Sequence, residues 1–350
     1  MRKHKTGWFC TYTPTEIAEA AGCQAVGIRT DSGREHEEVY LGDAMCSYVR
    51  SCLGGAVAGI YDDLDSVIIA HSCECMRRLN DGWNFKQKDI KPENLGVLDI
   101  PRICTEQSIE QFRRNLEDMR STIEKKYGEI PEESLRKAIK ENNLTRKLFL
   151  ELNGLRKQSS PPLTGVEMQE IIKRSMTEPR EEFNSFLERR LGTLRESDNS
   201  EHAGKARIMI YTGVGNEGLC RSVEDAGGIV VYEHACNGIR AFDTLVDENT
   251  DPLTALARRY LSKSPCPRML GDFSHRAISE CLDIIKDYRI DGIIYYSIKF
   301  CSNLQMNFIQ FREMIEAAIP VKVLEGDISE EVNSREITSF IRKIARRSAA

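Results

Sequence analysis

The sequence predicts an α/β protein with two doubly wound parallel-sheet lobes and a helical insertion between them. Short apolar runs alternate with helical patterns toward both ends of the chain, as in βαβ units. In the middle, apolar residues recur at three- and four-residue steps instead. The 350 residues suit two domains of roughly 100–200 residues each, with room for an inserted piece. We therefore expect an N-terminal α/β lobe over residues 1–104, the insertion over 105–199 and a C-terminal α/β lobe over 200–350.

The N-terminal lobe opens with a helix signal and continues with strand signals. Thr13, Pro14 and Glu16 supply a hydroxyl cap, a proline at the first helical position and an acid in the first turn. We expect this helix to end at Gly22. Short apolar runs bounded by turn residues predict three strands, at Gln24–Ile28, Ser66–Ala70 and Gly96–Ile100.

The central block carries two amphipathic helical patterns, and we expect its charged residues to face solvent. Their apolar members are Ile109, Phe112, Leu116, Met119 and Ile123, then Leu135, Ile139, Leu144, Leu148 and Leu152. The segment Ser159–Pro162 interrupts the block. We find no catalytic or binding motif in it.

The C-terminal lobe returns to alternating strands and helices, which again indicates a mainly parallel sheet. The expected strands are Arg207–Tyr211, Ile229–Tyr232, Gly292–Ser297 and Val321–Leu324. The expected helices are Leu219–Ala226, Ile278–Tyr288, Phe308–Ala318 and Ser334–Arg346. In sheets of this kind ligands bind beyond the carboxyl ends of the strands, so functional residues are sought there.

Composition narrows the class of protein and its compartment. The chain is 41% hydrophobic and 29% charged, with a net charge of −5 and no long basic run, so we expect no nucleic-acid partner. No apolar stretch reaches the ~20 residues of a membrane helix, and the N-terminus lacks the apolar core of a signal peptide. We expect the 12 cysteines to be reduced in the cytoplasm.

A glycine pattern suggests one function class. Residues 213–218 (GVGNEG) follow an expected strand and open an expected helix, and Glu233 ends the next strand. This arrangement is typical of dinucleotide binding, in which the glycines admit a pyrophosphate and the acid binds a ribose hydroxyl. A tight turn of a doubly wound sheet has the same pattern. An NAD(P)-dependent oxidoreductase is therefore kept as a remote alternative.

The cysteines suggest another class. The sequence contains no Cys-x-x-Cys, which argues against zinc ribbons and thioredoxin-like redox sites. Cys73 and Cys301 closely follow expected strands, and Cys46 lies in a segment with Cys52. Thiolates gathered at strand ends suit an iron–sulfur cluster, although a buried cysteine is more often a small core residue.

At these cysteines the sequence resembles the subunits of 2-hydroxyacyl-CoA dehydratases. The matching segments are residues 7–17 (GWFCTYTPTEI), 46–54 (CSYVRSCLG), 72–79 (SCECMRRL), 99–102 (DIPR), 236–240 (CNGIR), 251–260 (DPLTALARRY), 291–301 (DGIIYYSIKFC) and 324–327 (LEGD). They span nearly the whole chain in family order and resemble the D-component type of subunit. The same superfamily includes benzoyl-CoA reductase subunits and double-cubane cluster proteins.

The resemblance implies a [4Fe-4S] cluster held by three cysteines, matched here by Cys46, Cys73 and Cys301. It also implies that the glycine turn is part of the fold. Cys52 and Cys75 are additional thiols near the matched positions, which leaves a fourth ligand or a larger iron–sulfur cluster open. The hydroxyl of Thr11 is a candidate for the substrate pocket, and no catalytic residue is assigned.

The reaction implied by the resemblance is loss of water from a 2-hydroxyacyl-CoA. The proton removed is barely acidic, so ordinary acid–base catalysis is inadequate. One electron added to the thioester gives a ketyl radical that can expel the hydroxyl group, and an iron without a cysteine ligand could polarise an oxygen. The implied partners are an ATP-dependent iron–sulfur activator, a CoA thioester substrate and a homologous second subunit or a homodimer. A reductase or an electron-transfer subunit is the alternative.

Overall fold

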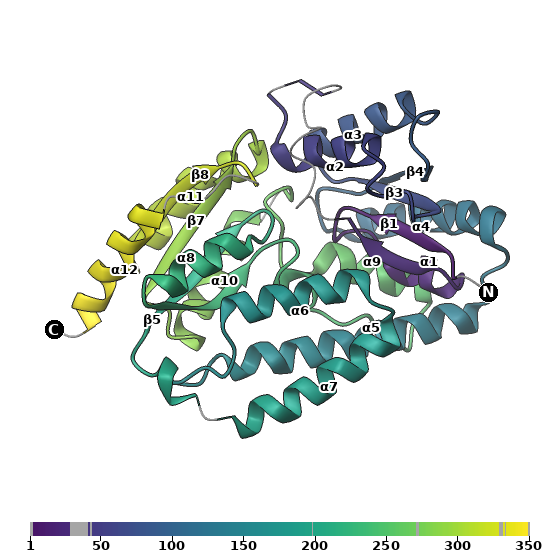
Figure 1. The fold of residues 1–350 in the computed structure, drawn as a ribbon. Coiled ribbons are helices and arrows are strands. Elements are labelled where there is room, and N and C mark those ends of the chain that lie inside the picture. Colours follow the sequence, from purple (N-terminus) through teal and green to yellow (C-terminus); the bar gives the residue numbers. More distant parts are fainter. Residues whose placement is uncertain are drawn as a thin grey trace. The chain divides into compact units, whose positions relative to one another are not determined.

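The computed structural model describes residues 3–28, 41–42, 44–197, 199–270, 273–328, 332 and 334–348. Their contacts divide the chain into two compact units (Figure 1). The first unit comprises Met1–Thr145, Met176–Glu182 and Thr244–Lys263, and the second comprises Arg146–Ser175, Phe183–Asp243 and Ser264–Ala350. Helices of residues 105–199 are thus shared between the units, and the three-part division at residues 104 and 199 stays a prediction.

The first unit is built on a parallel sheet of four strands in the order β2-β1-β3-β4. The strands are β1 (Lys5–Trp8), β2 (Gln24–Gly27), β3 (Ser66–His71) and β4 (Glu93–Asp99). All but the last residue of β3 are buried, whereas most of the edge strand β4 is not. Gly7 is required in β1 because a Cβ there would lie 2.8 Å from Leu64 Cδ1 and 2.9 Å from Ile28 Cδ1.

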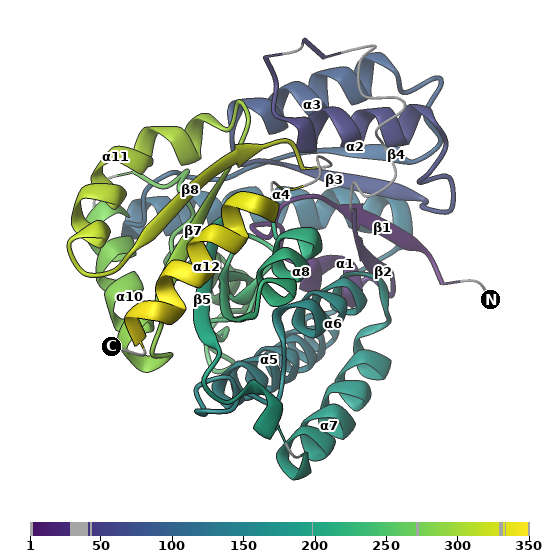
Figure 2. The same ribbon diagram turned by 60° about the vertical axis from the view of Figure 1, so that its left-hand side comes forward.

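Helices cover both faces of this sheet. They are α1 (Thr15–Ala20), α2 (Ser47–Val57), α3 (Glu74–Phe85), α4 (Glu106–Tyr127) and α9 (Pro252–Ser262). The helices α2 and α3 pack together on one face, while α4 lies with α1 and α9 on the other (Figures 1 and 2). This arrangement brings the starts of α2 and α3 to the carboxyl end of β3.

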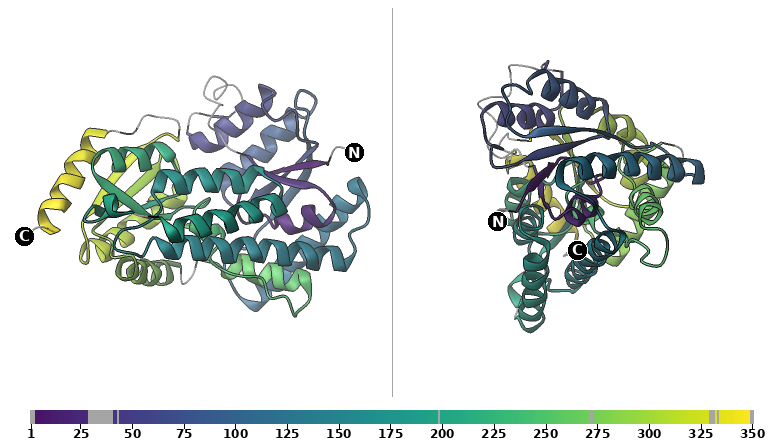
Figure 3. Two further views of the ribbon diagram at one scale, coloured as in Figure 1. Left: turned by 60° about the horizontal axis from the view of Figure 1, so that its bottom comes forward. Right: turned by 90° about the vertical axis from the view of Figure 1, so that its right-hand side faces the viewer.

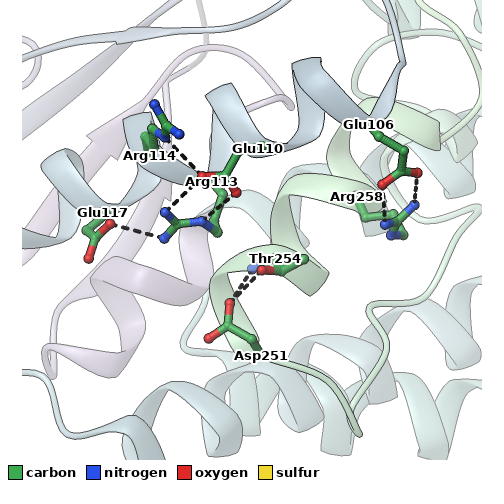
Figure 4. A network of polar contacts seen from close by, with 8 residues as sticks. All are labelled: Glu106, Glu110, Arg113, Arg114, Glu117, Asp251, Thr254 and Arg258. Carbon is green, nitrogen blue, oxygen red and sulfur yellow. Dashed lines mark hydrogen bonds and ion pairs between the residues drawn. The ribbon is translucent and has the colours of Figure 1, made fainter.

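Helix α9 joins the first unit although it lies far along the chain. Asp251 caps it by accepting hydrogen bonds from the backbone N–H and the hydroxyl of Thr254, at 2.8 and 2.7 Å. Arg258 pairs with Glu106 at the start of α4 through two hydrogen bonds of 2.7 and 2.8 Å (Figure 4). Because both side chains are exposed, this pair fixes orientation more than it stabilises the fold.

The second unit repeats the same plan. Its parallel strands are β5 (Ala206–Thr212), β6 (Gly228–His234), β7 (Gly292–Ile298) and β8 (Val321–Gly326), in the order β6-β5-β7-β8. Every residue of β5, β6 and β7 is buried, as expected for parallel strands covered on both faces. Two four-stranded parallel sheets with flanking helices confirm the predicted α/β fold class.

Helices also cover both faces of the second sheet. The helices α8 (Glu217–Asp225) and α12 (Ser334–Ser348) contact each other on one face. The helices α10 (Phe273–Asp287) and α11 (Ser302–Glu316) contact each other on the other face (Figure 2). The same unit contains two short 3-10 turns, η2 (Ser200–His202) and η3 (Ile239–Ala241).

The remaining helices are α5 (Glu132–Leu155), α6 (Gly165–Thr177) and α7 (Arg180–Glu196), which run as long rods in Figure 3. The expectation that their block exposes its charges is wrong at Arg156, whose side chain is fully buried just after α5. It donates to both carboxylate oxygens of Glu233 in β6, at 2.5 and 3.0 Å. This ion pair anchors the end of α5 to the second sheet.

None of the described helices is both long and apolar enough to cross a membrane.

Candidate functional site

The three cysteines matched by the resemblance each stand at the start of a helix. Cys46 immediately precedes α2, Cys73 precedes α3 and Cys301 precedes α11. The N-terminus of a helix carries partial positive charge, which favours the thiolate that binds metals. Each of the three thiols thus lies at a helix N-terminus, and Cys301 belongs to the second unit whereas Cys46 and Cys73 belong to the first.

Cys73 and Cys301 occupy equivalent places in the two sheets. Cys73 follows β3, which is third in the order of its sheet, and Cys301 follows β7, which is third in the order of the other. The turn before Cys301 is strained, because Phe300 has a φ of 61°, a left-handed conformation that is rare for an aromatic residue. Such strain often marks functional sites.

In the first unit three thiols lie together. Cys75, the second residue of α3, is hydrogen-bonded to the side chains of both Cys46 and Cys73. Cys10, in the loop between β1 and α1, is close enough to Cys73 to raise the pKa of its thiol. We call Cys46, Cys73 and Cys75 the thiol trio.

Hydrogen bonding controls the protonation of the trio. Hydrogen bonds from Cys46 and Cys73 hold the pKa of Cys75 far below its ordinary value. The hydrogen bond to Cys75, followed by burial, raises the pKa of Cys46, and the same two causes raise that of Cys73. The backbone N–H groups of Val49 and Met76 act in the opposite direction. The three thiols are therefore coupled, and their titration belongs to the trio as a whole rather than to one residue.

The other cysteine singled out by sequence, Cys52, lies apart from the trio's contacts. It is fully buried in α2, and burial raises its pKa while a hydrogen bond with Tyr48 opposes the rise. Within the described ranges no group of three or more His, Cys, Asp or Glu side chains could hold a single metal ion. Thiolates of an iron–sulfur cluster bind different iron atoms, so they need not converge on one point. The trio supplies thiol groups, the type of donor that such a cluster takes.

Thr11 lies in the same β1–α1 loop as Cys10 and is held by a residue that sequence reasoning missed. The buried ammonium of Lys263, just after α9, donates to the Thr11 carbonyl at 3.0 Å and to its hydroxyl at 3.1 Å. The same ammonium lies 4.3 Å from the centre of the Tyr12 ring, a cation–π distance. Lys263 lies three positions beyond the family segment 251–260, and the sequence analysis did not single it out.

A second contact joins α9 to the start of α1. Tyr260 donates to the carboxylate of the fully buried Glu16 at 2.9 Å. The Thr13 hydroxyl, between the two contacts, is buried and makes no hydrogen bond within the described part of the chain. Lys263 and Tyr260 therefore fix a polar loop, and the adjoining helix start, at the carboxyl edge of the first sheet.

The glycine turn of the second unit does not present an acid for ribose binding. Both carboxylate oxygens of Glu233 are taken by Arg156. The backbone N–H of Gly215 donates to Asn237 at 2.5 Å, and a Cβ on Gly215 would lie 2.8 Å from the Gln169 side chain. These contacts favour the interpretation as a tight turn of the fold.

Two buried basic residues at the ends of the second sheet were also missed by sequence reasoning. His234 ends β6 and stacks on Tyr211, with ring centres 4.4 Å apart. Burial, and then the charge of Arg240, lowers the pKa of His234 well below its ordinary value. Arg240 is itself buried and donates to the carbonyl of Thr212 at 3.1 Å. His234 is therefore a neutral aromatic core residue near neutral pH.

The fold and the helix-start cysteines define a two-lobed α/β protein with thiols at the N-termini of helices that follow its sheets. The chain belongs to the 2-hydroxyglutaryl-CoA dehydratase, D-component family, whose model matches residues 10–341. The resemblance noted in the sequence is therefore confirmed.

Curated relatives fall into two reaction types. The chain is 24% identical over 328 residues to the (R)-phenyllactyl-CoA dehydratase beta subunit of Clostridium sporogenes, covering 91% of this chain and 84% of the relative. It is 23% identical over 338 residues to the putative dehydratase subunit YjiM of Escherichia coli (strain K12), covering 92% and 86%. It is also 23% identical over 303 residues to one of the subunits of benzoyl-CoA reductase from Thauera aromatica, covering 83% and 76%.

Proposed function

We propose that this chain is the iron–sulfur subunit of a 2-hydroxyacyl-CoA dehydratase-type enzyme, a lyase that removes water from its substrate by a ketyl radical route. The observation that carries the proposal is the set of cysteines at helix starts, two of which meet in the first unit through Cys75. Membership of the D-component family supports the CoA thioester as the class of substrate.

The ligands that we propose for a [4Fe-4S] cluster are Cys46, Cys73 and Cys301. Each would bind iron as a thiolate at a helix N-terminus, where the helix charge and backbone N–H groups stabilise the anion. When bound, the cluster supplies single electrons to the thioester at a potential set by hydrogen bonds and burial. Reduced cysteines of this kind fit the cytoplasmic location expected from the sequence.

The chain's own polar residues near the trio would orient the substrate. The loop of residues 9–14 carries both Cys10, which acts on Cys73, and Thr11. Lys263 fixes the Thr11 backbone and hydroxyl from a buried position. A fixed hydroxyl beside the thiols could hydrogen-bond a substrate oxygen without reorganising, which is how preorganised polar groups favour a reaction.

The proposed enzyme needs further components. The dehydratase relative is named as a beta subunit, and the reductase relative is likewise named as one subunit among others, so both belong to enzymes of several parts. We propose a homologous second subunit or a second copy of this chain as the direct partner. A separate ATP-dependent iron–sulfur activator would deliver the electron.

The relative from benzoyl-CoA reductase favours a second candidate, a reductase or electron-transfer subunit with the same cluster. An assay of the anaerobic enzyme with activator, ATP and reductant separates the two. Release of water from (R)-phenyllactyl-CoA or 2-hydroxyglutaryl-CoA, with the enoyl-CoA formed catalytically, is expected for a dehydratase. Turnover of benzoyl-CoA with consumption of two electrons per molecule, and none of the hydroxyacyl thioesters, would contradict the dehydratase proposal.

A further inference from the structure

We propose that the exposed face of the C-terminal helix α12 binds the phosphate groups in the CoA part of the substrate. The inference rests on the proposed function, because it concerns the same CoA thioester. The face carries four exposed cationic side chains, Arg335, Arg342, Lys343 and Arg346, which we call the basic stripe. They line an open groove of about 760 Å³.

The basic stripe follows from the amphipathic pattern of α12. Arg335, Arg342 and Arg346 are seven and four residues apart, so they lie along one line of the helix. The helix packs on α8 and β5 through its opposite face. The apolar side chains of that face are all buried, at Ile337, Phe340, Ile341 and Ile344. The core therefore holds the helix in place while its cations point to solvent.

The basic stripe differs from other exposed arginines of this unit in its lack of acidic partners. Arg221 in α8 and Arg312 in α11 each pair with a glutamate of their own helix. Among the residues that the structure describes, none forms an ion pair or a hydrogen bond with a member of the stripe. The acid of α12, Glu336, pairs instead with Lys322 in β8. Neighbouring cations without counter-charges repel each other, so binding of an anion is favourable there.

Helix stability does not account for the position of Arg335. A cation near the C-terminus of a helix, such as Arg346, complements the helix dipole. Arg335 is the second residue of α12, where the same dipole disfavours a cation. A ligand with several anionic groups gives both ends of the stripe a common role.

The CoA part of the proposed substrate is such a ligand. It carries a diphosphate and a 3′-phosphate, which are ionised near neutral pH, and guanidinium groups bind phosphate through paired N–H donors. The groove also presents the hydroxyl groups of Ser334 and Ser339, which can donate to phosphate oxygens. Because the whole chain has a net charge of −5, a locally basic surface favours the approach of a polyanionic substrate.

Helix α12 also begins at a suitable edge of its own sheet. It starts at Ser334, shortly after β8 ends at Gly326, and the strand next to β8 is β7, which Cys301 follows. The carboxyl ends of these parallel strands lie at one edge of the sheet, where ligands of α/β proteins bind. From there α12 runs back beside the sheet (Figure 2). A CoA thioester bound along the stripe would thus extend from the edge that carries Cys301.

The test is calorimetric titration of the anaerobically purified full chain with CoA and with 3′-dephospho-CoA. We expect the Arg342→Gln/Arg346→Gln double variant to bind CoA about tenfold more weakly than the wild type, with a smaller preference for CoA over 3′-dephospho-CoA. Added salt should weaken CoA binding more in the wild type than in this variant. The matched control is Arg221→Gln/Arg312→Gln, which removes two exposed charges from the same unit and should bind as the wild type does.

Equal affinity of the wild type and the Arg342→Gln/Arg346→Gln variant for CoA would overturn the inference, as would a wild type that binds no CoA. If that variant binds CoA normally and no longer joins its partner subunit, the stripe is a protein interface and the inference is wrong. A wild type that binds CoA through the stripe but catalyses neither dehydration nor reduction of CoA thioesters would refute the proposed function alone.

Discussion

Buried charged residues hold the segments near the strand ends in place. Lys263 holds the β1–α1 loop in the first unit, and Arg156 holds the end of α5 to β6 in the second. A buried charge is costly unless its partner is present. Single substitutions at these residues should therefore lower the free energy of unfolding by more than substitutions in the exposed ion pairs do.

Replacing Lys263 with Met should destabilise the chain and weaken substrate binding. The Thr11 carbonyl and hydroxyl lose their hydrogen bonds to the ammonium, and hydrogen bonds to a charged group typically contribute about 1.5–3 kcal/mol of unfolding free energy. Chemical denaturation of the metal-free chain measures the first effect, and the KM for the thioester measures the second. The control is Lys88→Met at an exposed position, which should change neither quantity. Equal behaviour of the two variants would show that the loop does not depend on Lys263.

Replacing Glu233 with Gln should destabilise the second unit strongly. The change leaves the fully buried Arg156 guanidinium without a counter-charge, which typically costs about 3–5 kcal/mol. Urea unfolding followed by circular dichroism measures the loss. The exposed pair offers the control, since Glu106→Gln should leave the unfolding midpoint unchanged. A small effect at Glu233 would mean that solvent reaches this pair.

His234 should make the metal-free chain less stable in acid. Its pKa is lowered in the folded state, so below about pH 6.5 the unfolded chain binds the proton that the folded chain excludes. Stability is then full above that pH and falls by up to about 1.4 kcal/mol per pH unit below it. His234→Phe, which keeps a ring on Tyr211, should lose this dependence. Identical slopes of unfolding free energy against pH in both chains, between about pH 5 and 6.5, would refute this role of His234.

At the scale of elements, the structure explains why some strands could be predicted from the sequence and others could not. The strands β5, β6 and β7 are buried throughout and read as continuous apolar runs, so they were predicted. The strand β1 was missed because Lys5–Trp8 is short and includes a lysine and a glycine. The glycine serves close packing with Leu64 and Ile28, a requirement that only the three-dimensional neighbours reveal.

The N-terminal cap of α9 is an element whose contribution can be isolated. Asp251→Ala removes both hydrogen bonds to Thr254 and should cost about 0.5–2 kcal/mol, because the first turn loses its acceptor. Asp251→Asn keeps an oxygen in place and should retain most of the stability. Thermal unfolding of both variants measures the difference. If the two variants unfold at the same temperature as the wild type, the cap contributes nothing.

At the scale of the molecule, the two units share one strand order, and two of the proposed ligands lie at equivalent positions in it. Cys73 and Cys301 follow strands that are third in their sheets. The sequence indicated these positions through the resemblance and through their closeness to apolar runs. It left Cys75 and Cys52 as equals, because separating them needs the packing of α2 on α3. The contact of Lys263 with Thr11 could not be predicted for a similar reason, since the two residues are distant in sequence.

Anaerobic quantification of iron and sulfide in the full chain and its cysteine variants tests directly whether this protein holds an iron–sulfur cluster. We expect a brown wild-type protein with iron and sulfide in equal amounts. Cys46→Ser, Cys73→Ser and Cys301→Ser should each lose most of the iron, whereas Cys220→Ser, buried in α8, should retain it. A colourless, air-stable wild type would contradict the proposed cluster, and equal iron retention in all four variants would contradict the proposed ligands.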